Sequence, residues 1–426
     1  MSIRHAGASD PGLVRKNNED SFSADDGLGL YIVADGMGGH AGGEVASAAA
    51  CEEIRGIISQ NKDIIDEYRF QQSGVSGKEI SSLLAHAVKH ASARIKKMGE
   101  EKPELRGMGT TVEVALFIDD RAFFAHVGDS RIYLLRDGEV HQITKDHSLT
   151  NELLEMGHIQ SADEVKARFR NAVTRALGFY DTVEVDLLDM DLFPKDRFLL
   201  CTDGLHTSFE GDALQRMGGK VDPETAVQNL IRHANSRGGR DNITALVVDV
   251  TDASKDRAGQ VADRLDVLRG LALFRLLDYE ELLRIHNLVY PKEFQSGERI
   301  FAEGDLGDSL YVVLRGKVEI SKGSATVAHL GRGSHFGEMA LVDRASRSAD
   351  ATALETTSCL LLYRDDFYGI IHNHARTAVK LLWSLARVLT VRLRTTTGEL
   401  ESLRQQYEQL NARTPVDPLG DTLIEF

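Results

Sequence analysis

Acidic residues of this chain stand at the ends of several apolar stretches that have the composition of β-strands. These acids are Glu19, Asp20, Asp35, Asp129, Asp203 and Asp241. Because the strands of one core bring their ends together, we expect the acids to converge. Such a cluster is unstable without cations, because repulsion between like charges raises the pKa of each carboxyl group. The pattern therefore predicts a site for divalent cations.

The choice of cation follows from the residue types. No Cys or His spacing matches a zinc site, which favours a hard ion such as Mg²⁺ or Mn²⁺. These ions prefer carboxylate and carbonyl oxygens and retain several water molecules. Two ions bridged by one carboxylate would acidify a water for in-line attack on phosphorus.

The stretch 33–43, VADGMGGHAGG, places five glycines beside Asp35 and His40. Glycine allows another group to approach the backbone closely. The spacing G-x-G-x-x-A within this stretch also fits a relaxed dinucleotide fingerprint. In that case Asp35 would direct its charge at a pyrophosphate, and the acid expected about twenty residues further on is missing. A cation is therefore favoured over a dinucleotide.

Length, charge and cysteine content limit the classes of protein. A chain of 426 residues is long enough for two or three domains. A net charge of −15 and a pI near 5.5 argue against nucleic-acid binding. No apolar run has the length of a membrane span, and the N-terminus has no signal-peptide core, so no membrane partner is expected. The three cysteines are far apart, which predicts a reduced, cytoplasmic protein.

The chain consists of two unlike parts. Strand-like runs alternate with long helical stretches over residues 1–251, and the polar residues 252–264 are interpreted as a linker. From residue 265 onward, short alternating strands and glycine turns predict a small β-barrel. A helical pattern follows to residue 412, and the segment 413–426, with two prolines and a glycine, is expected to be loose.

Eight motifs in the first part occur in the order of a known enzyme family. They are DPGLVRKNNEDSF (10–22), VADGMGGHAGGEVAS (33–47), GMGTTV (107–112), HVGDSRIYLLRDG (126–138), ITKDHSL (143–149), VTRALG (173–178), LLCTDGL (199–205) and GRDNITALVV (239–248). With these motifs, segment 1–251 resembles the metal-dependent serine/threonine protein phosphatases of the PPM family, in their bacterial form. The resemblance implies an α+β fold: an antiparallel β-sandwich of two sheets flanked by helices, with the metal ions at one end.

The same resemblance implies roles for single residues. Asp35 resembles the bridging ligand of two Mn²⁺ or Mg²⁺ ions, and Gly36 the ligand that binds through its carbonyl oxygen. Asp203 and Asp241 complete the second metal's ligands, Glu19 and Asp20 hold metal-bound waters, and Asp129 with Asp203 resembles a third-metal site. Arg15 matches the arginine that binds the substrate phosphate, a role that suits a planar guanidinium.

Three histidines stand within or beside these motifs. His40 is the candidate for protonating the leaving alkoxide, which suits a pKa near neutrality. The alternative is a histidine that a flexible loop merely tolerates. His126, inside a strand pattern, and His147, at the start of a loop, are expected to be structural. Because none of the matched acids is replaced, we expect an active enzyme.

The stretch FGEMALVDRASRSA (336–349) carries a second constellation. Gly337 precedes a short helical segment whose first amides would face an anion. Arg347 is placed to pair with the same anion, while Glu338 would accept hydrogen bonds from a sugar hydroxyl. Together with the barrel pattern, this stretch resembles the phosphate-binding cassette of a cyclic-nucleotide-binding domain, here over about residues 265–395.

By that resemblance, Arg347 holds the cyclic phosphate and Glu338 the ribose 2′-hydroxyl, while Gly337 and Ser348 flank the phosphate. Ser346 stands where many members of the family have proline. The expected ligand is cAMP or cGMP, and Ser348 does not decide between them. The alternative is a domain of this shape that has lost ligand binding.

The last helical stretch has a heptad pattern. Apolar residues and one threonine follow each other at spacings of three and four: Val379, Leu382, Ala386, Leu389, Leu393, Thr396, Leu400, Leu403, Tyr407 and Leu410. This length suffices for a coiled coil, so residues 396–412 are interpreted as a coiled-coil extension and the chain as a parallel homodimer. The alternative is that the seam packs onto the chain's own barrel.

The two resemblances together predict a phosphatase that acts on phosphorylated proteins and is regulated allosterically by a cyclic nucleotide. A transcription factor would need a helix-turn-helix after the barrel, where one long helix and a short tail remain. A nucleotide-sensing scaffold or targeting module, whose second domain does not control catalysis, stays the alternative.

Overall fold

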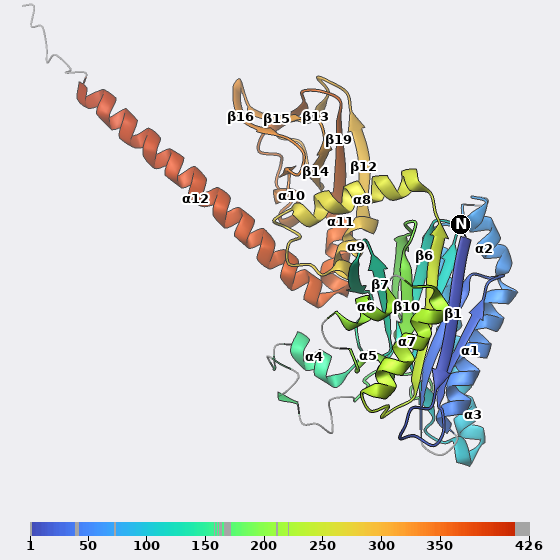
Figure 1. The fold of residues 1–426 in the computed structure, drawn as a ribbon. Helices are drawn as coiled ribbons and strands as arrows, with labels where there is room; N and C mark the ends of the chain where they lie inside the picture. The colour runs from blue at the N-terminus through green and yellow to red at the C-terminus, as the bar shows by residue number, and fades with distance from the viewer. Residues whose placement is uncertain are drawn as a thin grey trace, which may run out of the picture. The chain divides into compact units, whose positions relative to one another are not determined.

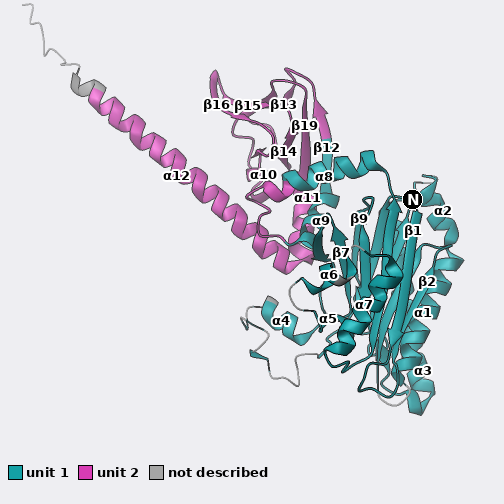
Figure 2. Cartoon of the chain, viewed as in Figure 1, with its two compact units in different colours: residues 1–267, 278–291 teal, residues 268–277, 292–426 magenta. Residues whose placement is uncertain are grey.

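The computed structural model describes residues 2–38, 42–71, 74–156, 158–159, 161, 164–165, 172–209, 212–219 and 221–413. The chain divides into two compact units (Figure 2). Unit 1 comprises Met1–Val267 and Asp278–Pro291, and unit 2 comprises Leu268–Leu277 and Lys292–Phe426.

Unit 1 is built around two antiparallel β-sheets (Figure 1). The first has the strand order β1 (Ser2–Asp10), β11 (Ile243–Asp252), β10 (Arg197–Cys201), β7 (Arg131–Arg136) and β8 (Glu139–Gln142). The second has the order β2 (Asp20–Asp25), β3 (Leu30–Met37), β5 (Val112–Ile118), β6 (Arg121–Val127) and β9 (Asp186–Asp191), and β4 (Gly109–Thr110) pairs with β3.

An aromatic layer joins the two sheets. The rings of Phe117 on β5 and Phe198 on β10 have centroids 5.3 Å apart, and Tyr31 on β3 packs against Phe117. Because alternate residues of a strand point to opposite faces, Ile32 instead joins the cluster on the other side of β3. The sheets therefore form a sandwich with a helix-covered outer face.

Helices cover both outer faces of the sandwich (Figure 1). Those on the β3 side are α1 (Gly42–Gln60), α2 (Lys62–Arg69), α3 (Gly77–Glu101) and the short 3₁₀ helix Pro103–Leu105. Those that follow in the chain are α4 (Leu149–Glu155), α5 (Asp203–His206), α6 (Ala213–Gly218) and α7 (Pro223–Ser236), of which α7 covers the β10 side.

Two more helices follow β11. Helix α8 (Lys255–Gly270) occupies most of the segment expected to be a linker. Helix α9 (Tyr279–Leu288) begins with a capping box formed by Asp278 and Glu281. It belongs to unit 1, where it packs against β8 and β9.

Unit 2 contains a small barrel of two four-stranded sheets. One sheet has the order β12 (Val289–Phe294), β19 (Thr357–Tyr363), β14 (Ser309–Arg315) and β17 (His335–Phe336). The other has the order β13 (Arg299–Phe301), β18 (Asp350–Ala353), β15 (Val318–Lys322) and β16 (Ala325–Leu330). The helices are α10 (Met339–Val342), α11 (Arg364–Asn373) and α12 (Ala375–Arg413). The predicted α+β architecture, a helix-flanked sandwich followed by a β-barrel with a C-terminal helix, is confirmed.

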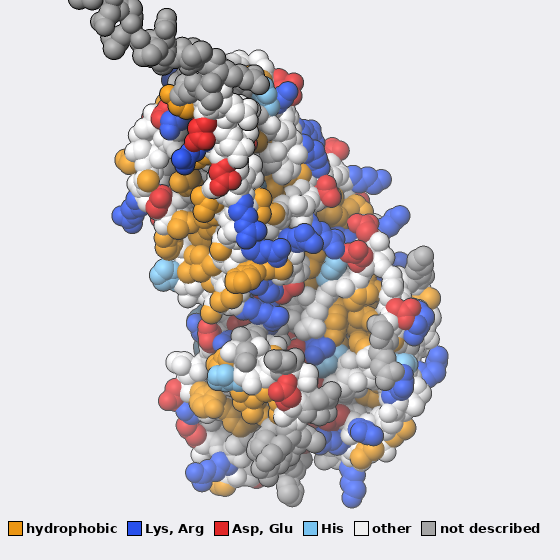
Figure 3. Space-filling model, turned by 90° about the vertical axis from the view of Figure 1, so that its left-hand side faces the viewer, with side chains coloured by type: hydrophobic (Ala, Val, Ile, Leu, Met, Phe, Trp, Pro, Cys, Tyr) orange, Lys and Arg blue, Asp and Glu red, His pale blue; other side chains and the backbone are white. Residues whose placement is uncertain are grey.

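Helix α12 buries one stripe and exposes another. Ala378, Leu381 and Leu385 are buried. The heptad seam contains a different set, of which Val379, Leu382, Leu393, Leu400, Leu403 and Tyr407 are exposed. Exposed hydrophobic side chains lie beside Lys and Arg side chains on the face shown in Figure 3. None of the helices among the described residues combines the length and apolar character needed to cross a bilayer.

Candidate functional site

Antiparallel pairing places the predicted acids at strand ends of unit 1. Asp20, at the start of β2, pairs with Asp35 near the end of β3. Asp203 follows β10, while Asp129 precedes β7 and Asp241 precedes β11. Since β10 lies between β7 and β11 and is antiparallel to both, its end lies beside their starts.

Hydrogen bonds to the carboxylate of Asp20 connect the two sheets at this end. Its Oδ2 accepts from Thr244 Oγ1 at 2.7 Å and from Thr202 Oγ1 at 2.9 Å. Thr202 directly precedes Asp203, and Thr244 lies three residues after Asp241. The other oxygen, Oδ1, is buried and has no hydrogen-bond partner among the described residues. That free acceptor fits a cation or a water that a cation holds.

Burial and repulsion disfavour the charged carboxylates. Burial raises the pKa of Asp35 well above its ordinary value, and the neighbouring acids, led by Asp20, raise it further. Burial likewise raises the pKa of Asp20 to about 7, that of Asp129 to about 7 and that of Asp203 to about 6. A divalent cation offsets this repulsion, and a set of carboxylate oxygens is what Mn²⁺ and Mg²⁺ bind.

Two glycines bring backbone atoms close to Glu19. A Cβ on Gly36 would lie 2.1 Å from the carbonyl oxygen of Gly43 and 2.4 Å from that of Glu19. A Cβ on Gly43 would lie 2.4 Å from Glu19 Oε2. Glu19 is held in turn by its amide, which donates to Asn242 Oδ1 at 2.8 Å. Glycine is thus required at both positions for this close packing.

Sequence reasoning missed the hydroxyl residues that bond the carboxylate of Asp20 and the backbone of Asp35. Besides Thr202 and Thr244, these are Thr110 and Thr111 beside Asp35. The Asp35 amide donates to Thr111 Oγ1 at 3.1 Å, and its carbonyl accepts from Thr110 Oγ1 at 2.8 Å. All four lie inside or beside the quoted motifs, but an uncharged threonine gives no signal of its partner.

The geometry limits how an ion is held. Within the described part of the chain, no group of three or more His, Cys, Asp or Glu side chains is arranged so that it could hold a metal ion by itself. The donors that fit Mn²⁺ or Mg²⁺ are therefore carboxylates on separate strand ends, completed by the water that these ions retain.

Arg15 lies at the edge of the acidic cluster. Its Nη2 donates to Asp241 Oδ2 at 2.8 Å, and its side chain is 54% exposed. Burial would lower the pKa of Arg15, but Asp241 and other nearby acids outweigh it and raise the pKa. His40, the candidate proton donor, lies outside the described residues.

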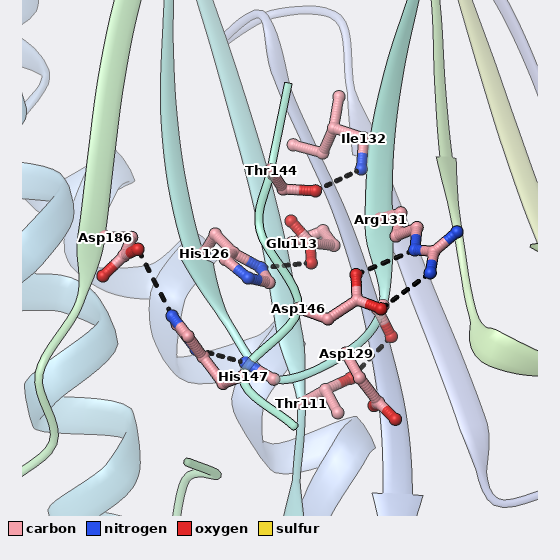
Figure 4. Close-up of polar contacts among 12 residues, drawn as sticks. Thr111, Glu113, His126, Asp129, Arg131, Ile132, Thr144, Asp146, His147 and Asp186 are labelled. Carbon is pink, nitrogen blue, oxygen red and sulfur yellow. Dashed lines mark hydrogen bonds and ion pairs between the residues drawn. The ribbon is translucent and has the colours of Figure 1, made fainter. Parts of the chain in front are cut away.

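A buried polar cluster lies beside the turn between β6 and β7 (Figure 4). His126 Nδ1 is 2.5 Å from Glu113 Oε1, and its Nε2 donates to the carbonyl of Lys145 at 2.7 Å. Burial would lower the pKa of His126, but Glu113 outweighs it and raises the pKa to about 9. His147 stacks on His126 and accepts from the amide of Gly128 at 3.0 Å. These contacts agree with the structural role expected for both histidines.

Unit 2 contains a cavity of about 480 Å³ beside the predicted cassette. Arg347 lies in its wall, where its Nη2 donates to Ser309 O at 3.0 Å and its Nη1 to Gly337 O at 3.2 Å. Gly337 has φ of +76°, and a Cβ there would lie 2.6 Å from Arg347 Nη1. Arg347 Nε is buried without a partner among the described residues, and burial lowers the pKa of this side chain. A bound anion would stabilise its charge.

The same cavity contains a buried carboxylate. Glu338 is 2% exposed, and its Oε1 accepts a hydrogen bond from Arg392 Nη1 on α12. Its Oε2 is buried and lacks a hydrogen-bond partner within the described ranges. Ser348 lines the cavity with Arg347, and α12 adds Thr395. The lining of the cavity thus includes the Arg347 guanidinium and a Glu338 carboxylate oxygen that has no partner among the described residues.

Two family models match the chain: Protein phosphatase 2C over residues 14–245, and Cyclic nucleotide-binding domain over residues 291–374. The serine/threonine protein phosphatase PstP of Mycobacterium tuberculosis is 38% identical over 252 residues, which are 59% of this chain and 46% of PstP. The chain therefore spans about half the length of this relative. The serine/threonine phosphatase stp of Listeria monocytogenes is 36% identical over 253 residues, 58% of this chain and 96% of that protein.

Solved structures agree with the phosphatase match. The crystal structure of PstP from Mycobacterium tuberculosis has a TM-score of 0.52 at 36% identity and covers 59% of this chain and 100% of that chain. The PstP catalytic domain in complex with two manganese ions has a TM-score of 0.50 at 36% identity, covering 59% and 99%. Stp1 from Staphylococcus aureus has a TM-score of 0.52 at 26% identity, covering 59% and 96%.

Proposed function

The chain belongs to the PPM, or protein phosphatase 2C, family, and we propose that it hydrolyses phosphoserine and phosphothreonine in proteins. The observation that carries the proposal is the placement of Asp20, Asp35, Asp129, Asp203 and Asp241 at neighbouring strand ends of one sandwich. Three of them have pKa values raised to about 6 or 7, as expected of acids that need a cation. The manganese ions of the related PstP structure support Mn²⁺ as that cation.

The assignment of ligands follows the family motifs. We assign Asp35 and the carbonyl of Gly36, with Asp203 and Asp241, to a pair of Mn²⁺ or Mg²⁺ ions, Glu19 and Asp20 to the waters these ions hold, and Asp129 with Asp203 to a third ion. When bound, the ions supply the Lewis acidity that makes a water nucleophilic and offset the charge of the phosphate.

The chain's own side chains bind and orient the substrate. Arg15 presents an exposed guanidinium at the edge of the acids, and its fork suits two phosphate oxygens. A substrate phosphate would compete with Asp241 for this guanidinium. His40 is proposed to give a proton to the leaving alkoxide of the substrate, because its motif places it close after Asp35.

Hydrolysis of a phosphothreonine peptide by the full chain, with and without Mn²⁺, tests this proposal. We expect turnover that depends on Mn²⁺ and stops on chelation. Because water attacks phosphorus directly, acid quenching should trap no phosphoenzyme. Turnover that survives complete removal of divalent ions would refute the assignment.

We further propose that unit 2 binds cAMP or cGMP, with cAMP slightly preferred, and regulates hydrolysis. Arg347, Gly337 and Ser348 would surround the cyclic phosphate, and Glu338 would accept from the ribose. Support comes from Arg347 Nε and Glu338 Oε2, two buried polar atoms that have no hydrogen-bond partner among the described residues. The first would donate to the phosphate, and the second would accept from the ribose. Coupling is supported by Arg392, which joins Glu338 to α12.

Calorimetry with each cyclic nucleotide, followed by phosphatase assays at saturating ligand, tests binding and regulation separately. We expect heat of binding and relief of inhibition. Binding without a change in hydrolysis would instead favour a targeting module. Absence of binding to either nucleotide would leave unit 2 without the proposed ligand.

The exposed seam on α12 supports a parallel homodimer. The seam residues are not those that α12 buries within unit 2, namely Ala378, Leu381 and Leu385. A repeating row of exposed leucines is typical of a helix that pairs with a second copy. The substrates are expected to be proteins phosphorylated by serine/threonine kinases.

A further inference from the structure

Helix α9 is fixed to the sandwich of unit 1 at both of its ends. The Tyr279 ring stacks on His141 at 3.9 Å, and its hydroxyl accepts from Arg136 Nη1 at 3.0 Å. At the other end, Asn287 Nδ2 donates to the carbonyl of Asp189 at 2.7 Å. The helix lies between the two family matches, outside both, and still packs as part of unit 1.

Two glutamates in the first turn of α9 contact one lysine of unit 1. Lys145 Nζ is 2.9 Å from Glu280 Oε2 and 3.6 Å from Glu281 Oε1, and both glutamates are buried. Buried carboxylates are costly unless paired, so this contact fixes Lys145 against α9. The carbonyl of the same lysine accepts from His126 Nε2.

The two residues after Lys145 hold the turn that carries Asp129 (Figure 4). The amide of His147 donates to Gly128 O at 2.7 Å, and His147 Nδ1 accepts from Gly128 N at 3.0 Å. Asp146 accepts two hydrogen bonds from Arg131, at 2.8 and 2.7 Å. Asp129 therefore stands between two residues that this segment fixes.

We propose that Glu280 and Glu281 of α9 act through Lys145 as positioning residues for the carboxylate of Asp129. Groups that orient a metal ligand commonly set the affinity of its site. The chain runs from Leu288 directly into β12 and enters unit 2 at Lys292, so unit 2 is covalently joined to this helix. A force that unit 2 exerts on α9 would therefore act through Lys145 and change the Mn²⁺ affinity of the Asp129 site. The inference rests on the proposed role of Asp129 in metal binding.

Mn²⁺ binding to the full chain tests the inference without relying on activity. The binding is measured through the electron paramagnetic resonance signal of free Mn²⁺. In Lys145→Met we expect the weakest class of Mn²⁺ site to lose affinity by about 10-fold or more, with tighter classes unchanged. Amide exchange of a peptide spanning residues 126–132 should become faster. Because this change removes one cation from beside two buried carboxylates, and Glu280 keeps its ion pair with Arg284, a second variant adds Glu281→Gln.

Arg197→Met is the matched control, because Arg197 forms another buried ion pair in unit 1, with Asp249 at 2.5 Å. The charge-compensated variant should recover stability but should still bind Mn²⁺ poorly at the weakest class of site, because the contact between Lys145 and α9 remains absent. Wild-type Mn²⁺ affinities in both Lys145 variants, equal losses in the control, or a wild-type chain without a weak class would overturn the inference. Failure of the proposed function would be recognised by a different result, namely that the wild-type chain does not hydrolyse phosphopeptide in the presence of Mn²⁺.

Discussion

The guanidinium of Arg392, on α12, donates a hydrogen bond to the buried carboxylate of Glu338, next to α10. The helix that carries the heptad seam is thus tied to the carboxylate that we assign to the ribose of a cyclic nucleotide. A ribose hydroxyl that donates to Glu338 would change the contact between this carboxylate and Arg392. A ligand in this cavity therefore acts on α12 through the pair, provided that it binds one position of the helix better than another.

Replacing Arg392 should separate binding from regulation. In Arg392→Ala, Arg347 remains to hold the phosphate, so calorimetry should still detect nucleotide binding. The effect of the nucleotide on phosphopeptide hydrolysis should largely disappear, because the tie to α12 is gone; a coupling of this kind typically changes affinity about 5- to 150-fold. Arg394→Ala, two residues along α12, is the control and should behave as wild type. Full regulation in Arg392→Ala would rule out this route.

Replacing Arg347 should have the opposite result. Arg347→Ala removes the cation that we assign to the cyclic phosphate, and a charge-assisted hydrogen bond contributes about 1.5–3 kcal/mol, so affinity should fall at least about 10-fold. Basal Mn²⁺-dependent hydrolysis should stay unchanged. Arg344→Ala, an exposed arginine of the same stretch, should leave binding intact. The assignment of Arg347 to the phosphate fails if calorimetry gives the same affinity for both variants.

Asp203→Asn tests the metal assignment by removing one charge without changing shape. We expect the variant to fold and to lose turnover by more than about 100-fold, because groups that merely orient a ligand contribute about 10- to 100-fold. Mn²⁺ binding measured by calorimetry should weaken in parallel. Asp137→Asn, an acid outside the cluster, should retain both properties. Near wild-type turnover of Asp203→Asn would show that the pair of ions is held elsewhere.

The raised pKa values predict how the metal-free protein responds to pH. Asp20 and Asp129 have pKa values of about 7 in the folded chain, above the ordinary value of about 3.9 for aspartate. Between these values the folded state binds more protons than the unfolded state, so its stability falls as pH rises from about 4 to about 7. Melting in EDTA should occur at a lower temperature at about pH 7.5 than at about pH 5.5.

Mn²⁺ binds the deprotonated carboxylates, so its stabilisation should show the reverse trend. The rise in melting temperature on adding Mn²⁺ should be larger at about pH 7.5 than at about pH 5.5. Asp203→Asn should reduce this rise, whereas Asp137→Asn should not. Metal-free protein that grows more stable as pH rises through 7 would contradict the predicted charges.

The acids of the site can be predicted from the sequence more readily than the residues that hydrogen-bond to them. Asp35 and Asp203 stand at strand ends beside glycine, a local signal that can be read without a fold. The hydrogen bond between Thr244 and Asp20 joins residues 224 positions apart, and it depends on how the sheets stack. No local pattern specifies such a contact.

The position of α9 escaped sequence reasoning for a related reason. A barrel domain was expected from residue 265, yet Tyr279–Leu288 packs on the sandwich of unit 1. Its amphipathic pattern indicates that one face is buried but does not identify the partner. The deciding contacts, such as Glu280 with Lys145, pair a helix with a loop more than a hundred residues earlier.

The seam of α12 gives the last prediction, that the full chain is a dimer held by this helix. Light scattering at micromolar concentration should give twice the chain mass of 46.9 kDa. Leu403 is 61% exposed and lies in the seam, so Leu403→Glu would place two like charges at the helix contact and should weaken association. Gln405→Glu adds the same charge on the outer side of the heptad and should leave the dimer intact. Truncation after Arg394 should also give monomers. A monomeric wild-type chain, or equal behaviour of the two glutamate variants, would mean that the seam serves another purpose.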